Sequence, residues 1–510
     1  MGFVVMLTVV GLVVFVVALA IFDVTQRRHA ILHNFPVLGH FRYILEKIGP
    51  ELRQYIVTDN DEERPFSRDQ RRWVYASSKQ ENEYFGFGSD NDFDRANPGY
   101  VIVKHSAFPH PPTAADADGT HPVPAAKVVG AWRGRRHAFR PASVVNISGM
   151  SFGSLSGAAV EALNRGAKLA GCWQSTGEGG LSTFHQKGGD LVFQIGTGYF
   201  GVRNAAGEFD LARLVDLVAA NPVRAIEVKL SQGAKPGLGG MLPGAKVSPT
   251  IAAVRGIEVG KDCLSPAYHR VFSDIDGMVQ FIETIAEATG VPVGIKSAVG
   301  DSTFWPALAQ RMAATGTGPD FVIIDGGEGG TGAAPLAFSD HVALPFRIGF
   351  PRVYRAFAEA DLHHQVAFGG SGKLGFPESA LLALGMGCDW VGLGREPMLA
   401  IGCVQAQRCH TDHCPTGVAT QKPWLVKGLD PDLKSVRCAN YLITLRKELL
   451  RLAHACGQSH PSLVGLDRLE LLDGDGGARE ASAAYGYQPG WGLPHPEQAE
   501  TVNRLVHTPR

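Results

Sequence analysis

The pattern of hydrophobic and polar positions changes at about residue 143. From there to about residue 405, short apolar runs rich in β-branched residues alternate with stretches of helical periodicity. Continuous apolar runs between helices are typical of strands buried in a parallel sheet. The pattern predicts strands over 143–148, 172–176, 191–196, 225–230, 292–297, 321–325, 365–370 and 390–394.

Helices are expected between these strands, for example over 155–170 and 274–289. Eight strand–helix units in this length fit a (β/α)8 barrel, and glycine or polar residues recur where the strands end. We therefore expect an α/β chain built on a TIM barrel, with a doubly wound parallel sheet as the alternative. The long gap at 231–291 predicts an inserted excursion.

The N-terminus has a different pattern, since residues 2–22 carry no charged side chain. At 1.5 Å per residue such a segment spans the apolar core of a bilayer, about 30 Å thick. Arg27, Arg28 and His29 follow it, which puts the rest of the chain in the cytoplasm. We expect a single-pass anchor in the inner (cytoplasmic) membrane with a cytoplasmic catalytic domain. A signal peptide and a buried helix are the alternatives.

The domain organisation follows from these patterns. We expect an anchor over 1–28, a juxtamembrane subdomain and linker over 29–140, the barrel over 141–455 and a tail over 456–510. The subdomain is charged, aromatic and irregular, and we expect it to pack on the main body. The tail has the composition of an extended segment.

Composition narrows the function classes. The net charge is −1, with 45% hydrophobic and 19% charged residues, which is typical of a globular protein and argues against a nucleic-acid partner. Eight cysteines in a reducing compartment are not expected to form disulfides. The residues do not decide between a monomer and an oligomer.

Three cysteines lie close together in "CVQAQRCHTDHCPTGVATQ", residues 403–421. The spacing is C-x5-C-x4-C, and a proline follows the last cysteine. Wide gaps and a Cys-Pro ending favour an iron–sulfur cluster. Zinc completed by His410 or His413 and plain structural thiols stay open as alternatives. The loop follows the eighth strand, so a redox centre there could exchange electrons with a cofactor in the barrel mouth.

Other candidate residues stand at the strand ends, where barrels carry their active sites. The loops "GGSG" (369–372) and "GLGR" (392–395) follow strands seven and eight, where barrels often bind phosphate. Lys296 ends a buried strand, so its ammonium must meet an anion or a cavity, or form a Schiff base. Glu178 and Glu328 are acid/base candidates that could instead only cap helices.

Five stretches carry a family resemblance. They are "SGMSFGSLS", "STGEGG", "SQGAKPGLGGMLPGAKV", "GGEGGTGAAP" and "GCVQAQRCHTDHCPTGVATQ", in that order from about residue 146 to 421. The chain resembles the flavin-binding synthase domain of glutamate synthase, in a stand-alone form.

The resemblance implies an FMN-binding barrel with a 3Fe–4S cluster that passes electrons to the flavin. The flavin would then reduce the imino acid formed from 2-oxoglutarate and ammonia to L-glutamate. The implied cluster ligands are Cys403, Cys409 and Cys414. The implied flavin contacts are Met150, Ser151, Thr176, Gln194 and Lys296. The implied phosphate contacts are Gly369, Gly370, Ser371, Gly392, Gly394 and Arg395. Lys296 and Glu328 are the catalytic candidates.

Departures from the family pattern concern the substrate rather than the cofactors. Leu238 and Met241 replace a carboxylate and an amide, and Tyr199 replaces an arginine that could hold a substrate carboxylate. No amidotransferase segment precedes the barrel, so ammonia or an amine is the expected nitrogen source.

Three functions remain in competition. The first is glutamate-synthase-like reduction of a 2-imino acid, driven by ferredoxin, a reductase subunit or a membrane carrier. The second is an anchored dehydrogenase or N-methylglutamate-synthase-like enzyme with another substrate. The third is a zinc-stabilised barrel without redox chemistry.

Overall fold

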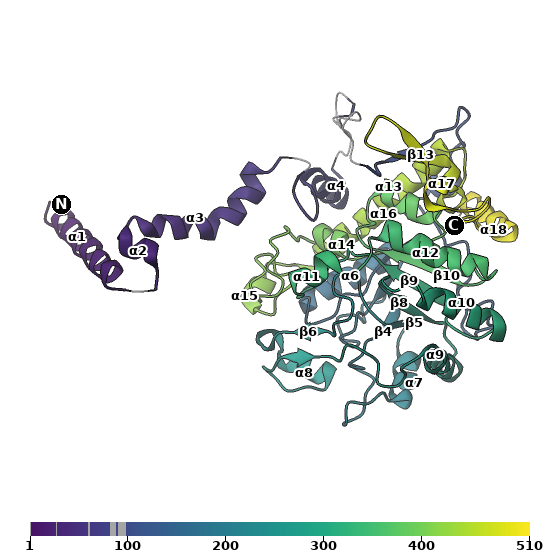
Figure 1. The fold of residues 1–510 in the computed structure, drawn as a ribbon, viewed down its shortest axis with the longest axis horizontal. Helices are drawn as coiled ribbons and strands as arrows, with labels where there is room; N and C mark the ends of the chain where they lie inside the picture. Colours follow the sequence, from purple (N-terminus) through teal and green to yellow (C-terminus); the bar gives the residue numbers. More distant parts are fainter. Residues whose placement is uncertain (1, 27, 60–61, 82–87, 90–97, 510) are drawn as a thin grey trace. The chain divides into compact units, whose positions relative to one another are not determined.

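The computed structural model describes all residues except 1, 27, 60–61, 82–87, 90–97 and 510. The chain divides into two compact units, Met1–Arg72 and Trp73–Arg510 (Figure 1). The second unit contains the barrel.

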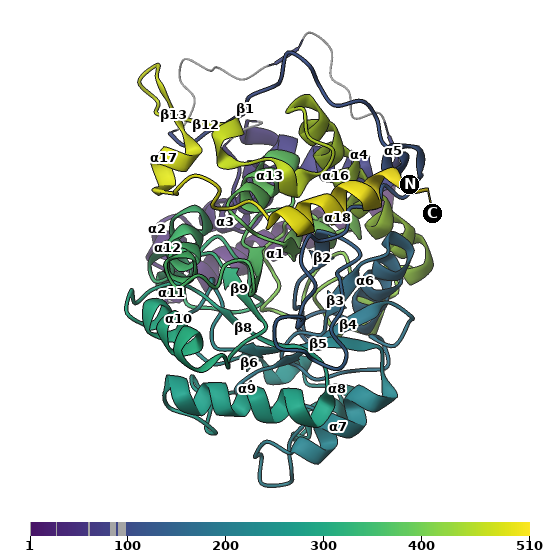
Figure 2. The same ribbon diagram turned by 90° about the vertical axis from the view of Figure 1, so that its right-hand side faces the viewer.

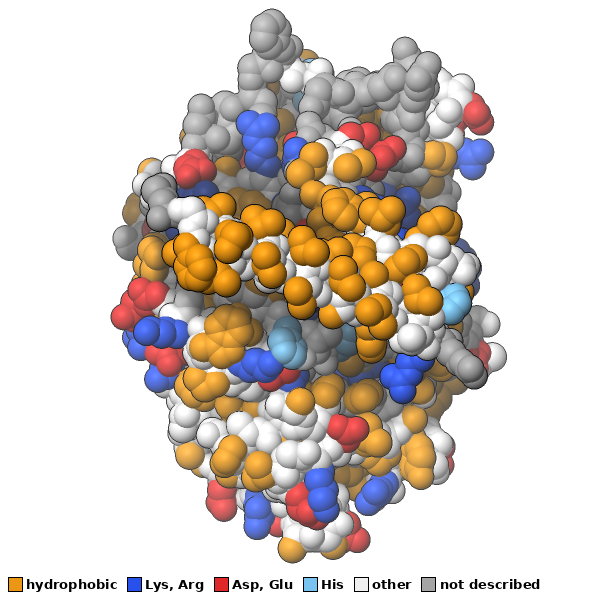
Figure 3. Space-filling view, turned by 90° about the vertical axis from the view of Figure 1, so that its left-hand side faces the viewer, with side chains coloured by type: hydrophobic (Ala, Val, Ile, Leu, Met, Phe, Trp, Pro, Cys, Tyr) orange, Lys and Arg blue, Asp and Glu red, His pale blue; other side chains and the backbone are white. Residues whose placement is uncertain are grey.

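The first unit is helical rather than irregular. Its elements are α1 (Gly2–Thr25), α2 (Ala30–Asn34), α3 (Gly39–Leu52) and η1 (Arg53–Val57). The helix α1 is long and apolar enough to cross a membrane. Figure 3 shows hydrophobic side chains gathered in a broad band. The expectation of irregular structure is wrong for α3, because its charged residues lie on one face of a helix with an apolar opposite face.

The eight predicted strands are present and close into one barrel (Figure 2). All neighbouring pairs are parallel, in the order β10-β11-β2-β3-β4-β5-β8-β9. The TIM barrel is therefore confirmed. The strands are β2 (Val145–Ile147), β3 (Trp173–Ser175), β4 (Asp190–Ile195), β5 (Val223–Lys229), β8 (Val293–Ser297), β9 (Phe321–Asp325), β10 (Ala367–Ser371) and β11 (Trp390–Leu393).

Helices surround this barrel because their apolar faces cover the outward-facing strand residues. They are α6 (Gly157–Ala170), α7 (Leu211–Ala220), α9 (Ile275–Thr289), α10 (Phe304–Thr315), α11 (Leu336–His341), α12 (Phe346–Glu359), α13 (Pro377–Gly385) and α14 (Arg395–Ala400). The two helices predicted from the sequence correspond to α6 and α9. The expected excursion contains β6 (Met241–Leu242), β7 (Cys263–Leu264), η3 (Gly244–Lys246) and α8 (Pro249–Arg255).

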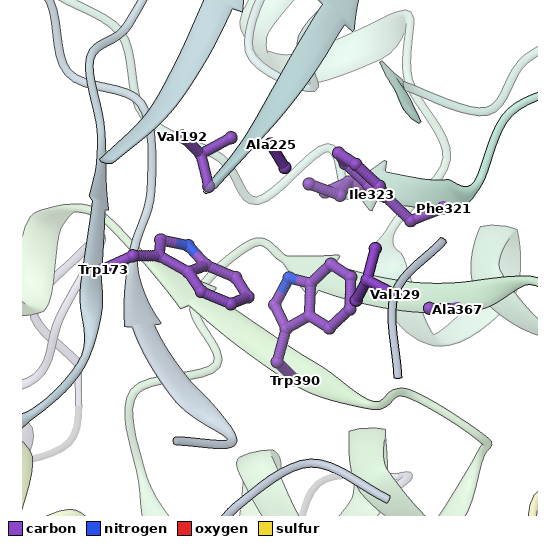
Figure 4. Packing of buried hydrophobic residues seen from close by; sticks show 8 residues of the cluster. All are labelled: Val129, Trp173, Val192, Ala225, Phe321, Ile323, Ala367 and Trp390. Atoms are coloured by element: carbon purple, nitrogen blue, oxygen red, sulfur yellow. The ribbon is translucent and has the colours of Figure 1, made fainter. Parts of the chain in front are cut away.

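The barrel interior is apolar toward the amino ends of the strands. Trp173 and Trp390 meet edge to face with ring centroids 5.2 Å apart, at the centre of the cluster in Figure 4. The other members come from neighbouring strands and from a segment preceding β2: Val129, Val192, Ala225, Phe321, Ile323 and Ala367. Side chains alternate along a strand, so the residue two positions further on faces the same interior, nearer the carboxyl end.

The C-terminal region is folded, so the prediction of an extended tail is wrong. The long helix α16 (Pro431–Ala455) packs on α6, and the strand β12 pairs with β1 and β13. The remaining elements are β1 (Val101–Val103), α4 (Arg68–Lys79), α5 (Ala114–Ala117), α15 (Pro423–Val426), η4 (Pro461–Leu463), η5 (Leu466–Arg468), β12 (Leu469–Leu472), β13 (Ala478–Glu480), α17 (Ala481–Tyr485) and α18 (Pro496–His507).

Buried His460 makes stability depend on pH. Its Nε2–H donates to Pro124 O at 2.9 Å, and its Nδ1 accepts from Ser462 N–H at 3.1 Å, which fixes the neutral ring. Burial lowers the His460 pKa from 6.5 to about 4. The unfolded chain binds the proton first, so this stability is present above pH 6.5 and is lost as the pH falls toward 4. The full loss is about 3 kcal/mol.

The test is a pair of urea titrations across this pH range. We expect His460→Gln to be less stable at neutral pH and to have a flatter pH dependence than the parent protein. The exposed His137→Gln is the matched control and keeps the parent slope. An unchanged slope in His460→Gln would contradict the assignment.

Candidate active site at the carboxyl end of the barrel

A polar layer lies above the apolar interior, at the carboxyl end of the strands. Two positions beyond Trp173, Val192, Ala225 and Ile323 in their strands stand Ser175, Gln194, Glu227 and Asp325, all buried. Lys296 from β8 belongs to the same layer. The fold therefore concentrates ionisable groups where barrel enzymes carry their chemistry.

Lys296 meets two of these strand ends. Its Nζ donates to Ser148 Oγ at 3.2 Å and lies 4.0 Å from Asp325 Oδ2. The side chain is buried, so the ammonium depends on these partners for compensation. The expectation that Lys296 faces an anion inside the barrel agrees with this contact.

Asp325 is held by two further contacts. Ser371 Oγ donates to Oδ1 at 2.5 Å, and the Gly233 N–H donates to Oδ2 at 2.8 Å. Burial alone raises the pKa of Asp325, but Lys296, Ser371 and Gly233 outweigh it and lower the pKa. Asp325 is thus a fixed negative charge beside Lys296.

Glu227 differs from Asp325 in its protonation. Gln194 donates its side-chain amide to Glu227 Oε1. Burial raises the pKa of Glu227, and Lys296 only partly opposes the effect. Glu227 therefore keeps a proton to higher pH than an ordinary glutamate and is a further acid/base candidate.

A second ion pair stands at the rim. Lys229 Nζ lies 2.9 Å from Glu178 Oε1 and donates to Gln232 Oε1 at 2.6 Å. Burial raises the pKa of Glu178, but Lys229 outweighs it and keeps the carboxyl ionised. Glu178 thus participates in the mouth and does not cap a helix through these contacts.

The loops after β2 and β3 approach each other closely. A Cβ on Gly149 would lie 2.8 Å from Gln194 Nε2 and 3.0 Å from Ser175 Oγ, and one on Gly177 would lie 2.5 Å from Ser151 N. Met150 and Ser151 are half-buried on this contact. Ser175 Oγ is buried without a hydrogen-bond partner among the described residues. Such an orphaned hydroxyl fits a polar ligand.

The Thr176 hydroxyl is engaged by the protein itself. It donates to Gly177 O at 3.1 Å and accepts from Gln194 N–H at 3.1 Å. The side chain is fully buried. Its hydroxyl therefore holds β3 against β4, and only the backbone of Thr176 remains for a ligand.

The two predicted phosphate loops are packed unequally. A Cβ on Gly369 would meet Trp390 Nε1 at 2.6 Å, and one on Gly370 would meet Phe346 Cζ at 2.8 Å. Packing alone explains these two glycines. By contrast, a Cβ on Gly394 would meet nothing within 4 Å, and Gly392 has only ordinary contacts. The open space lies beside Gly392 and Gly394.

Arg395 and Glu328 meet at the carboxyl end of the barrel. Arg395 Nη2 donates to Glu328 O. Glu328 Oε2 accepts from Phe346 N–H at 2.8 Å, at the first residue of α12. That contact corresponds to the helix-capping alternative. Burial raises the pKa of Glu328.

The cysteine loop is bound to the loop after β2. Gln421 Nε2 donates to Gly153 O at 3.0 Å and to Leu155 O at 2.9 Å, and Ser156 N–H donates to Val418 O at 2.9 Å. Ser151 belongs to the same loop after β2. The cysteine loop and the predicted flavin loop are therefore held together.

Lys246 reinforces this junction. Its Nζ donates to Ser154 O at 2.7 Å, to Ala419 O at 3.1 Å and to Cys409 O at 3.3 Å. The side chain is buried and forms no ion pair with a carboxylate in the described part of the chain. Burial lowers the Lys246 pKa, while Asp412, Cys409 and Cys414 oppose that effect. A buried ammonium here fits anionic sulfur ligands.

The three thiols Cys403, Cys409 and Cys414 stand in one loop. Among the described residues, no three His, Cys, Asp or Glu side chains lie close enough together to hold one metal ion. Burial and Cys414 raise the pKa of the Cys409 thiol, with Lys246 opposing.

The three positions that depart from the family pattern, Tyr199, Leu238 and Met241, lie outside the layer of ionisable residues. Tyr199 is buried, and its hydroxyl accepts from Arg270 N–H at 3.0 Å and lies 3.2 Å from His269 Nδ1. It therefore fastens the excursion to the end of β4. Leu238 and Met241 are exposed on the excursion.

Sequence reasoning missed Glu227, Lys229 and Asp325. Each stands at an inward position of an apolar strand. Glu227 and Asp325 follow a core side chain by two residues, and Lys229 follows one by four residues. Counting inward positions along each strand would have found them. The role of Lys246 depends on contacts with distant segments and had no local signal.

Comparisons with known proteins agree with the motifs. The family model described as "Conserved region in glutamate synthase" matches residues 132–459. A glutamate synthase large subunit-like protein of Bacillus subtilis is 40% identical over 86% of this chain and 89% of its own length. An archaeal glutamate synthase [NADPH] of Methanocaldococcus jannaschii is 37% identical over 64% of this chain and 61% of its own.

A solved flavocytochrome b2 variant with pyruvate bound has a TM-score of 0.45 at 15% identity, covering 83% of this chain and 91% of that one. The family assignment rests instead on the match over more than half of the chain and on the Bacillus relative. The chain belongs to the glutamate synthase family.

Proposed function

We propose that the chain is an FMN- and 3Fe–4S-dependent oxidoreductase that reduces a 2-imino acid, formed from 2-oxoglutarate and ammonia, to an amino acid such as L-glutamate. Membership of the glutamate synthase family supports the oxidoreductase class. The observation that carries the proposal is the junction made by Gln421 and Lys246. It joins the cysteine loop to the loop that borders the ionised barrel mouth.

Three groups of residues have distinct roles in this proposal. Cys403, Cys409 and Cys414 hold the cluster. Met150, Ser151, Gln194, Lys296 and the backbone of Thr176 contact the flavin. Ser371, Gly392, Gly394 and Arg395 bind its phosphate, with Gly369 and Gly370 shaping the strand beneath. When bound, FMN couples one-electron supply to hydride delivery.

The ionised residues orient the substrate and handle protons. Lys296, balanced by Asp325, presents positive charge toward the mouth and attracts an anionic group. Glu227 holds a proton on the oxygen that Gln194 does not occupy and can donate it to a developing amine. The Glu178–Lys229 pair keeps the rim polar.

An anaerobic reoxidation assay tests the substrate. The purified protein is reduced and mixed with 2-oxo acids plus ammonia or methylamine. We expect 2-oxoglutarate with ammonia to reoxidise it and to form glutamate in equal amount. Reoxidation by a quinone and by none of the imino acids would overturn the synthase assignment.

A different substrate is the second candidate function. It is favoured by Tyr199, which is buried and engaged with the excursion, and by the apolar Leu238 and Met241 at the surface. Reoxidation with methylamine but not ammonia would identify an N-methylglutamate-synthase-like enzyme. The relatives named for NADPH make that nucleotide one electron donor to compare with ferredoxin.

We also propose that α1 anchors the protein in the cytoplasmic membrane. We expect the full chain to sediment with membranes, to resist alkaline carbonate and to dissolve in detergent. Removal of residues 2–25 is expected to release it into the soluble fraction. A full chain that remains soluble without detergent would contradict the anchor.

Lys246 offers a test of the junction itself. Lys246→Met removes the donor to Ser154 O, Ala419 O and Cys409 O, so we expect the iron content to fall and the cysteine loop to become sensitive to protease. A loss of about 10- to 100-fold in cluster affinity is typical of supporting residues. Lys261→Met, an exposed lysine of the same excursion paired with Glu258, is the control. Full iron content in Lys246→Met would contradict this role.

A further inference from the structure

We propose that α3 lies in the surface of the membrane, with its apolar face among the lipid headgroups and upper acyl chains. The inference rests on the proposed anchoring through α1 and goes beyond it. It assigns a second lipid-binding element, in the same compact unit as α1.

The side chains of α3 form a one-sided stripe. Phe41, Ile44, Leu45, Ile48 and Leu52 recur at helical spacing and occupy about one third of the helix circumference. All five are exposed, from 38% to 69% of their surface. Arg42 and Glu46, 2.9 Å apart, lie on the opposite side. Five large apolar side chains exposed together mark an interaction surface.

The position of α3 relative to α1 identifies lipid as the occupant. Asp23, in the last turn of α1, accepts from Val37 N–H at 2.8 Å and lies 2.9 Å from His40 Nε2, in the first turn of α3. With 24 residues, α1 is about 36 Å long, slightly more than the apolar core of a bilayer. Its end therefore emerges at the membrane surface, and α3 begins there.

Charge is consistent with this placement. Residues 26–53 contain Arg27, Arg28, Arg42, Lys47 and Arg53 against two glutamates. Basic residues close to the cytoplasmic leaflet are attracted by anionic lipids. An amphipathic helix with a basic surrounding is typical of helices that lie in the interface plane.

Photocrosslinking in the full chain tests the inference. The protein is reconstituted in vesicles of phosphatidylethanolamine and phosphatidylglycerol, with benzoylphenylalanine replacing Leu45 on the apolar face or, as the matched control, Glu46 on the polar face. We expect lipid adducts from Leu45→benzoylphenylalanine and none from Glu46→benzoylphenylalanine.

Other products would overturn the inference. A crosslink from position 45 to residues 73–510 of the same chain would show that the barrel unit covers this face. A crosslink to another copy would show a dimer, and equal lipid labelling from both positions would show unspecific contact. Failure of the anchor is recognised separately, because the full chain would then leave the vesicles in alkaline carbonate. A carbonate-resistant protein without adducts at position 45 refutes only the role of α3.

Discussion

Cys409→Ser is expected to abolish the iron–sulfur absorption of the protein while leaving much of the flavin in place. Cys409 lies in the loop that Lys246 fastens to the rest of the mouth through Cys409 O. A serine hydroxyl keeps the size of the side chain and removes the thiolate that iron requires. Donor-driven turnover is expected to fall by at least about 100-fold.

The control is Cys456→Ala. Cys456 is a buried thiol at the end of α16, outside the cysteine loop, so its replacement should leave iron content and spectrum unchanged. Spectra, iron analysis and melting curves of both variants check the prediction. Full iron in Cys409→Ser would show that the cluster assignment is wrong.

Lys296→Met is expected to lower turnover by about 100-fold or more, a loss typical of removing a fixed charge from a reacting centre. We expect the change to affect stability less than turnover. Removing one partner of a buried ion pair typically costs about 3 to 5 kcal/mol. Asp325 keeps its bonds from Ser371 and Gly233, so we expect the loss of unfolding free energy to lie at the low end, at about 3 kcal/mol.

The readouts are kcat, KM, flavin content and the melting temperature. Lys187→Met is the matched control, since Lys187 pairs with Glu161 at 3.2 Å, a partly exposed contact worth less than about 1 kcal/mol. Unchanged turnover in Lys296→Met, with folding and flavin intact, would refute a role for Lys296 in the site.

The sequence predicts the barrel well because buried parallel strands leave a local signal. The runs that become β9 and β10 are continuous and apolar, and their neighbours follow from the closed order. Because these runs are almost wholly apolar, they give little indication of the ionisable residues that face the barrel mouth. Glu227 and Lys229 interrupt an otherwise apolar strand, and only the inward register shows that both belong to the mouth.

Other features of the site depend on contacts that no local pattern contains. The capping contact of Glu328 depends on where α12 begins, and the hydroxyl of Thr176 is used by the neighbouring strand. The cysteines could be singled out by spacing, but Lys246, which joins their loop to the loop after β2, lies more than 150 positions before them. The helix α18 was missed although its sequence is uninterrupted and has proline only in the first turn, so its local signal was present.

The absorption spectrum and metal content of the purified full chain test the central claim most directly, since the claim is that a flavin and an iron–sulfur cluster share the carboxyl end of this barrel. We expect flavin bands over a broad iron–sulfur absorption, with iron bound and both signals bleached by anaerobic reduction. A colourless protein that contains zinc would contradict it.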